Sequence, residues 1–233
     1  MALTLSGTNG VVGAGFTVDA SGVSVTAGVG TFSSLQGSGA NLTALPAANL
    51  TGTVAVGRFP AGTILQVVNT FVQASSSYGT SANSHYTLTP LNTTITPIGT
   101  NSKFLISAQV SGEGTIHDNQ LFIRLIRNTA SGFPGSDNIA ICTGDNGSNN
   151  SAPENTSAYH GYATSNSDST ISTTHITNHV DSPSVAAGGN LQYKVQIYLQ
   201  SSMTWYLNRC VTLYDATYGD YLPSFVTVME IAQ

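Results

Sequence analysis

The chain has 233 residues, of which 40% are hydrophobic and only 7% are charged, and its net charge is −5. Its apolar runs are far shorter than the roughly 20 residues of a membrane-spanning helix, and its two cysteines allow at most one disulfide. Six basic residues against eleven acidic ones do not supply the basic patch through which proteins bind nucleic-acid phosphates. We therefore expect a β-rich protein without membrane insertion or nucleic-acid binding.

Residues 1–62 differ in composition from the rest and are predicted to form an arm. They contain twelve of the 24 glycines, and their only aromatic residues are three phenylalanines. A segment of this kind removes too little apolar area from water to offset its chain entropy, so it does not build a core of its own. Within it, residues 22–27 alternate apolar and polar side chains with the two-residue period of a strand.

Short repeats follow in the second half of this arm. Ala-Asn-Leu-Thr occurs at residues 40–43 and again at 48–51, and Leu-Pro-Ala at 45–47 is echoed by Phe-Pro-Ala at 59–61. Repeats with one apolar anchor each are expected where identical chains wrap together and share a core. A flexible Gly/Ser tether is the alternative, but it leaves the regular placement of leucine and proline unexplained.

Residues 63–233 hold all ten tyrosines and the single tryptophan, and 171 residues are enough for one autonomous domain. Alternating apolar residues predict strands, whereas no segment predicts a convincing helix. The strongest patterns lie at 104–110, 120–127, 191–199, 205–213 and 225–231, with further runs near 64–72, 85–96, 138–143, 158–164 and 170–180. Eight to ten strands without helices indicate an antiparallel sandwich or jelly roll.

Several segments resemble bacteriophage tail-fibre and virion-fibre proteins, particularly those of marine and cyanobacterial phages. Residues 37–53, Gly-Ser-Gly-Ala-Asn-Leu-Thr-Ala-Leu-Pro-Ala-Ala-Asn-Leu-Thr-Gly-Thr, resemble their shaft repeats, and residues 52–62 resemble the lead-in to their tip. The C-terminal module of such fibres is similar to this chain at residues 95–106, 121–128, 181–183, 193–196, 206–209 and 227–231.

The resemblance implies an all-β homotrimer that is exposed on the surface of a virion and is assembled in the host cytoplasm. Residues 1–62 would form a thin arm that contacts other virion proteins, and residues 63–233 a globular tip similar to trimeric jelly rolls of the tumour necrosis factor or C1q kind. The shaft core would then be built from the apolar anchors Leu42, Leu45, Leu50 and Phe59. No cofactor is implied.

Metal binding and catalysis are not expected. His175 and His179 fall on a predicted strand, where both would point to one face about 13 Å apart, too far to share an ion within one chain; a site around a trimer axis could still use one of them. The oxygen-rich residues 145–150 lack the acidic ligand that ends an EF-hand loop. Cys142 and Cys210 are predicted to be packed rather than reactive, and no nucleophile motif or carboxylate pair stands out, so we expect no enzyme.

Three charges interrupt otherwise apolar strands. Arg209, Glu230 and Lys194 could bind a ligand or could fix strand register and trimer contacts through partly buried ion pairs. We predict the structural role and, as its specific form, an ion pair between Arg209 and Glu230.

A recognition surface is predicted where tyrosines lie among polar residues, because aromatic rings pack on sugar C–H groups while amides bond hydroxyls. The residues are Tyr214, Tyr218, Tyr221, Tyr159 and Tyr162, although the same rings could instead pack between subunits. Two functions remain: a fibre whose tip binds a host-surface glycan with the gain of multivalency, or a capsid decoration, cement or head-fibre protein whose arm clamps capsid subunits and whose tip binds no receptor.

Overall fold

The computed structural model describes residues 16–19, 22–25, 54–116, 120–141, 157–160, 171–211 and 221–233. The chain divides into two compact units, Met1–Thr53 and Val54–Gln233. Residues 54–62, which the sequence assigns to the arm, therefore belong to the second unit. In the first unit, β1 (Phe16–Asp19) pairs with β2 (Gly22–Val25) as an antiparallel hairpin, and β2 coincides with the strand expected at 22–27. Leu42, Leu45 and Leu50 lie outside the described residues.

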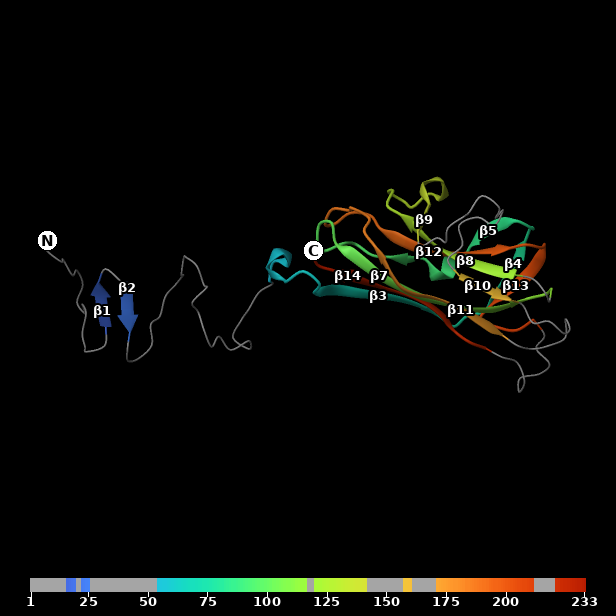
Figure 1. The fold of residues 1–233 in the computed structure, drawn as a ribbon, viewed down its shortest axis with the longest axis horizontal. Helices are drawn as coiled ribbons and strands as arrows, with labels where there is room; N and C mark the ends of the chain where they lie inside the picture. The colour runs from blue at the N-terminus through green and yellow to red at the C-terminus, as the bar shows by residue number, and fades with distance from the viewer. Residues whose placement is uncertain are drawn as a thin grey trace. The chain divides into compact units, whose positions relative to one another are not determined.

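The second unit is an antiparallel β-sandwich, and its two layers are visible in Figure 1. Its first layer, the β3 sheet, contains six strands: β3 (Ile64–Val72), β4 (Ser76–Thr80), β7 (Lys103–Gly114), β11 (Ser172–Asp181), β13 (Met203–Leu207) and β14 (Ser224–Ile231). Its second layer, the β8 sheet, contains β5 (Ser84–Thr87), β6 (Thr93–Thr94), β8 (Gln120–Asn128), β9 (Ile139–Ile141), β10 (Ser157–His160) and β12 (Gln192–Leu199).

The chain passes repeatedly between the layers. Strand β4 leads into β5, β7 into β8, and β11 into β12, each time from the β3 sheet to the β8 sheet. Two antiparallel sheets connected in this way form a jelly roll. Apart from three 3-10 turns, η2 (Val56–Arg58), η3 (Thr89–Leu91) and η4 (Gly135–Asp137), the described residues contain only strands and loops, and no helix among them is long and apolar enough to cross a bilayer.

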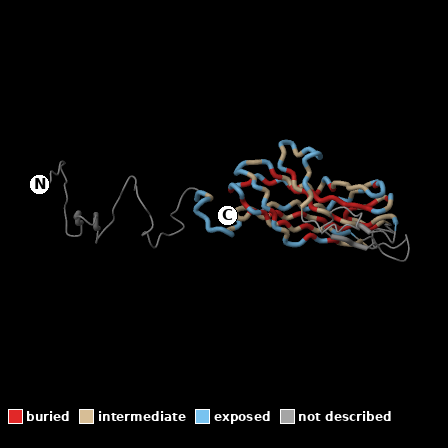
Figure 2. The backbone as a smooth tube through the Cα atoms, turned by 45° about the horizontal axis from the view of Figure 1, so that its top comes forward, coloured by how far each residue is buried: buried red, intermediate tan, exposed pale blue. Residues whose placement is uncertain are grey.

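The core lies between the layers because the strands alternate with period two. In β7 from Phe104 to Val110 and throughout β14 the even-numbered residues are buried. In β12 the odd-numbered residues Tyr193, Val195, Ile197 and Leu199 meet them from the other sheet. Figure 2 shows this buried layer in red, enclosed by exposed turns. Each fully buried Leu, Ile or Val stabilises the folded state by about 1.5–3 kcal/mol relative to an exposed one. Strands whose apolar residues alternate are therefore placed with these residues toward the core, as the sequence pattern predicted.

The predicted strand at 205–213 is shorter than expected because a buried asparagine ends it. Asn208 adopts φ 62° after β13, and its Nδ2 donates to the carbonyl oxygens of Val72 (2.8 Å) and Ala74 (3.0 Å). Its Oδ1 accepts from the Ser224 hydroxyl at 2.6 Å, and the same hydroxyl oxygen accepts from the Ser111 amide. These bonds join the ends of β3, β13 and β14 to β7, which alternation alone does not reveal.

Gly112 allows β7 and β13 to approach closely. A Cβ at this position would overlap the Trp205 ring and the Tyr206 carbonyl oxygen. We expect Gly112→Ala to lower the free energy of unfolding by about 2–3 kcal/mol, because overpacking forces the backbone or the ring to shift. Gly79→Ala in β4 is the matched control, since no atom lies within 4 Å of the added carbon there. Equal urea midpoints for the two variants would contradict this close approach.

Candidate functional site

Of the five tyrosines predicted to bind a ligand, Tyr221 has a described side chain. It is 57% exposed, next to the 41% exposed Leu222 and just before β14. Tyr159 lies on β10, whose backbone pairs it with Leu121 of β8. Tyr162, Tyr214 and Tyr218 lie outside the described residues, so a shared tyrosine surface stays a prediction. Phe59, predicted as a shaft anchor, follows η2 and is 39% exposed.

The two histidines considered for a metal site do not share a face. A β-bulge between Ile176 and His179 shifts the register of β11 on β7, so that His175 lies opposite Gln109 while His179 lies opposite the buried Ile106. Directly paired residues share a face, hence His175 points outward and His179 inward. Alternation without the bulge placed both on one side, and that expectation was wrong. Within the described part of the chain, no three His, Cys, Asp or Glu side chains come together as metal ligands.

Glu230 is fully buried at the end of β14 and its carboxylate is surrounded by donors. The amides of Ile98 and Gly99 donate to it at 3.0 and 2.8 Å, the Ser102 hydroxyl at 2.7 Å, and Gln66 Nε2 completes the set. Burial alone raises the pKa of a carboxyl group, but these hydrogen bonds outweigh it and hold the pKa of Glu230 below its ordinary value. The buried charge therefore fastens the 98–102 loop to the sandwich.

The predicted ion pair between Arg209 and Glu230 is wrong. Arg209 Nη1 donates to the carbonyl oxygens of Cys210 (3.2 Å) and Val211 (3.4 Å), and its guanidinium stacks 3.8 Å above the Tyr206 ring. The salt bridge that the described residues do contain joins other residues. Amide donors in a loop can stabilise a buried carboxylate through charge-assisted hydrogen bonds, and residue alternation carries no sign of them.

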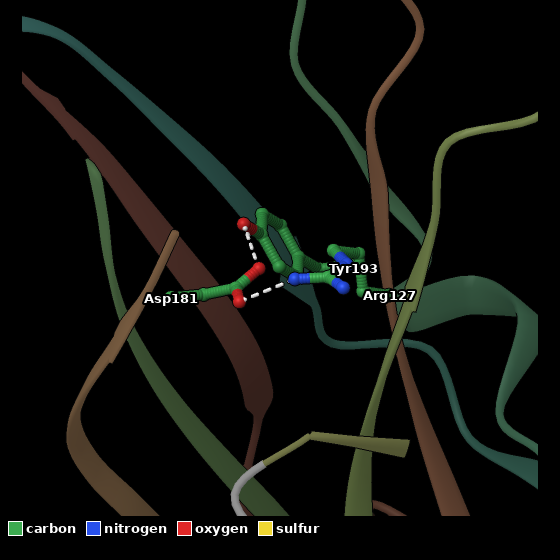
Figure 3. Close-up of polar contacts among 3 residues, drawn as sticks. All are labelled: Arg127, Asp181 and Tyr193. Atoms are coloured by element: carbon green, nitrogen blue, oxygen red, sulfur yellow. Dashed lines mark hydrogen bonds and ion pairs between the residues drawn. The ribbon is translucent and has the colours of Figure 1, made fainter. Parts of the chain in front are cut away.

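The salt bridge links the two sheets through Asp181 at the end of β11 (Figure 3). Arg127 Nη1 of β8 lies 2.6 Å from Asp181 Oδ1, and the Tyr193 hydroxyl of β12 donates to Oδ2 at 2.9 Å. Asp181 is 7% exposed and Tyr193 is fully buried. Burial, reinforced by the Asp181 charge, raises the pKa of Tyr193, so the phenol stays protonated and donates. The sequence did not single out these residues as a cluster.

Lys194 is the third charge that interrupts an apolar strand, and it also serves the structure. It is 6% exposed, and its Nζ donates to the Phe133 carbonyl oxygen (3.0 Å) and Asn138 Oδ1 (3.2 Å). Burial lowers the pKa of Lys194. The lysine therefore ties the loop after β8 to β12 on the face of that strand that lies away from the core.

A cavity of about 300 Å³ lies beside the 98–102 loop, lined among others by Val56, Ile98, Thr100, Ala187 and Gln233. Its polar groups are largely engaged, since the Thr100 hydroxyl accepts from the Ala187 amide and the neighbouring amides of the loop donate to the Glu230 carboxylate. The arrangement offers no convergent set of free donors for a ligand.

No family model matches the chain, and no curated protein matches it in sequence. Among solved structures it is similar to a chain of infectious bursal disease virus, Gt strain, with TM-score 0.40 and 12% identity over 72% of this chain and 38% of that one. It is also similar to Eiger TNF from S. frugiperda, with TM-score 0.38 and 11% identity over 72% and 94% of the two chains. The chain thus spans less than two fifths of the viral protein. Scores this low carry no functional argument, and the jelly roll rests on the strand order itself.

Proposed function

We propose that the chain is a structural protein of a virion: a homotrimeric fibre whose first 62 residues attach it to other virion proteins and whose β-sandwich is displayed for adhesion to a host-surface glycan. The observation that carries the proposal is the division between a glycine-rich, repeat-containing first unit and a self-contained jelly roll. The resemblance of residues 37–62 to fibre shafts supports the same reading.

The described polar clusters support a structural role rather than a catalytic one. Glu230, Asp181 and Lys194 each hold a loop or join the two sheets, and each is engaged by partners within the sandwich. Loops held by such contacts provide a platform on which weak binding sites gain avidity when several copies act together.

The virion role is tested by locating the protein on particles. Antibodies raised against the whole chain are applied to intact phage particles from the host strain in which the encoding phage grows, followed by gold-labelled electron microscopy. We expect label on the particle surface, at an axis that shows whether the chain belongs to the tail or the head. Particles that contain no such polypeptide by mass spectrometry would contradict the proposal.

The adhesion role is tested separately with the purified full chain on a panel of bacterial polysaccharides. We expect binding to at least one polysaccharide and a loss of about fivefold or more for Tyr221→Ala, because an exposed ring contributes stacking area to a sugar. Ile139→Ala is the control, since Ile139 is 48% exposed on β9. If the protein is found on particles but the purified chain binds none of the polysaccharides, the decoration or cement role is favoured instead.

A further inference from the structure

We propose that the outer face of the β3 sheet, on strands β3, β14, β7 and β11, is the surface through which the chain binds further copies of itself. The inference rests on the proposed homotrimer and names the part of the sandwich that makes it. It follows from the register of the four strands, which aligns one row of apolar side chains across all four strands and places two phenylalanines side by side in a second row.

The first row crosses all four strands. Val67 of β3 lies opposite Met229 of β14, Met229 opposite Leu105 of β7, and Leu105 opposite Val180 of β11. The two ends of the row are the most exposed, at 54% for Val67 and 51% for Val180. Directly paired residues lie side by side on one face of a sheet. These four apolar side chains therefore form one row, and its two ends are exposed to water in the single chain.

A second row runs parallel to the first. Phe71 of β3 lies opposite Phe225 of β14, Phe225 opposite Gln109 of β7, and Gln109 opposite His175 of β11. Phe71 is 54% exposed, an unusual position for a phenylalanine on the surface of a single soluble chain. Gln109 Nε2 already donates to the Pro223 carbonyl oxygen at 2.9 Å.

The polar side chains between the two rows already form hydrogen bonds within the sheet. Asn69 Nδ2 donates to Thr227 Oγ1 at 2.7 Å, and Ser107 Oγ accepts from the Asn178 amide at 3.3 Å. When a partner surface covers groups that already hydrogen-bond within the chain, fewer donors and acceptors are left unpaired than when it covers groups bonded only to water. The face is therefore prepared for contact with another apolar surface rather than for polar recognition.

Four apolar residues of this face are more than half exposed. Ile64, Val67 and Phe71 lie on β3 and Val180 lies on β11, so the exposed apolar side chains reach from one side of the four strands to the other. One side of a standard interface buries about 800 Å². A small ligand would leave most of such a flat area in water.

Charge favours a second copy as the occupant. Among the described residues of the four strands, no Asp, Glu or Arg lies in these two rows, and Lys103 pairs with Ile231 at the margin of the face. Two chains of net charge −5 repel wherever acidic surfaces meet, but they can meet on this face without placing like charges together. Association of the first units would also bring sandwiches of several copies together at high effective concentration.

The test uses the full chain with Val67→Asp and Val180→Asp combined, and Ile139→Asp as the matched control on the β8 sheet. Both substituted valines are exposed, so the single chain should keep its fold, which thermal unfolding verifies. Oligomeric mass is measured by analytical ultracentrifugation, and hydroxyl-radical labelling of Met229 and Phe71 reports whether the face is covered.

We expect the wild-type chain and the control to be multimeric, with Met229 and Phe71 labelled at least about fivefold more slowly than in the double variant, as for residues inside a desolvated interface. A multimeric wild-type chain in which both residues are labelled as fast as in the double variant would overturn this inference and leave the proposed trimer in place. A wild-type chain that is monomeric at all concentrations would overturn the trimer as well.

Discussion

Replacing Glu230 with alanine is expected to lower the free energy of unfolding by about 3–5 kcal/mol, one of the two largest single-residue effects in this chain. The substitution removes an acceptor that serves the backbone amides of Ile98 and Gly99 and the hydroxyl of Ser102, of which the Gly99 amide and the Ser102 hydroxyl are buried. Donors left unpaired in the interior carry their full desolvation cost. Chemical unfolding of the full chain, followed by tryptophan fluorescence, measures the loss, because Trp205 is buried in the same sandwich.

Glu230→Gln separates charge from shape at the same position. The glutamine amide keeps one acceptor oxygen for the loop, but its NH₂ group faces the remaining donors. We therefore expect a loss in the free energy of unfolding that is smaller than for the alanine variant. A loss below about 1 kcal/mol for the alanine variant would show that the 98–102 loop does not depend on the carboxylate.

The same carboxylate predicts the response to acid. Its pKa in the folded chain lies below the ordinary value of 4.5, so the unfolded chain takes up the proton first as the pH falls. The stabilisation by Glu230 is therefore complete above about pH 4.5 and is lost as the pH falls through the folded-state pKa. The midpoint of thermal unfolding should fall more steeply between pH 5 and 3 in the wild-type chain than in Glu230→Gln. Parallel curves would contradict a depressed pKa.

Asp181→Ala is the second substitution with a large expected effect, about 3 kcal/mol or more. It leaves the Arg127 guanidinium, which is 18% exposed, without its counter-charge, and it leaves the buried Tyr193 hydroxyl without an acceptor. Breaking a buried pair by removing one partner costs more than replacing both. Unfolding of the single variants and of the combined Arg127→Met and Asp181→Ala variant provides the comparison, with Tyr193→Phe as a control that keeps the ring. A combined loss equal to the sum of the single losses would contradict coupling across the two sheets.

Regular alternation made most of the sandwich predictable from the sequence. The even positions of residues 104–110 and the odd positions of residues 191–199 face the core as expected. Successive side chains of a strand point to opposite faces, so a strand with alternating apolar residues buries them on one face. Strand β4 escaped prediction since Ser-Ser-Tyr-Gly-Thr has almost no apolar residues. It is held instead by pairing with β13 and by contact between the Tyr78 and Trp205 rings.

The sites were less predictable because they depend on contacts between distant residues. Glu230 was correctly singled out as an unusual buried charge, but its partners are backbone amides of a loop, which leave no pattern in the sequence. The bulge in β11 depends on Asn178 at φ 55°, and one inserted residue reverses every later side chain, including His179. Asp181 was noticed only within a resemblance and not as a link between sheets.

The measurement that tests the account most directly is the mass of the purified full chain in solution, by sedimentation equilibrium or native mass spectrometry. The account predicts a species of three times the single-chain mass of 24.1 kDa that persists on dilution to micromolar concentrations. A species of the single-chain mass at every concentration would contradict a role that depends on the association of copies of this chain.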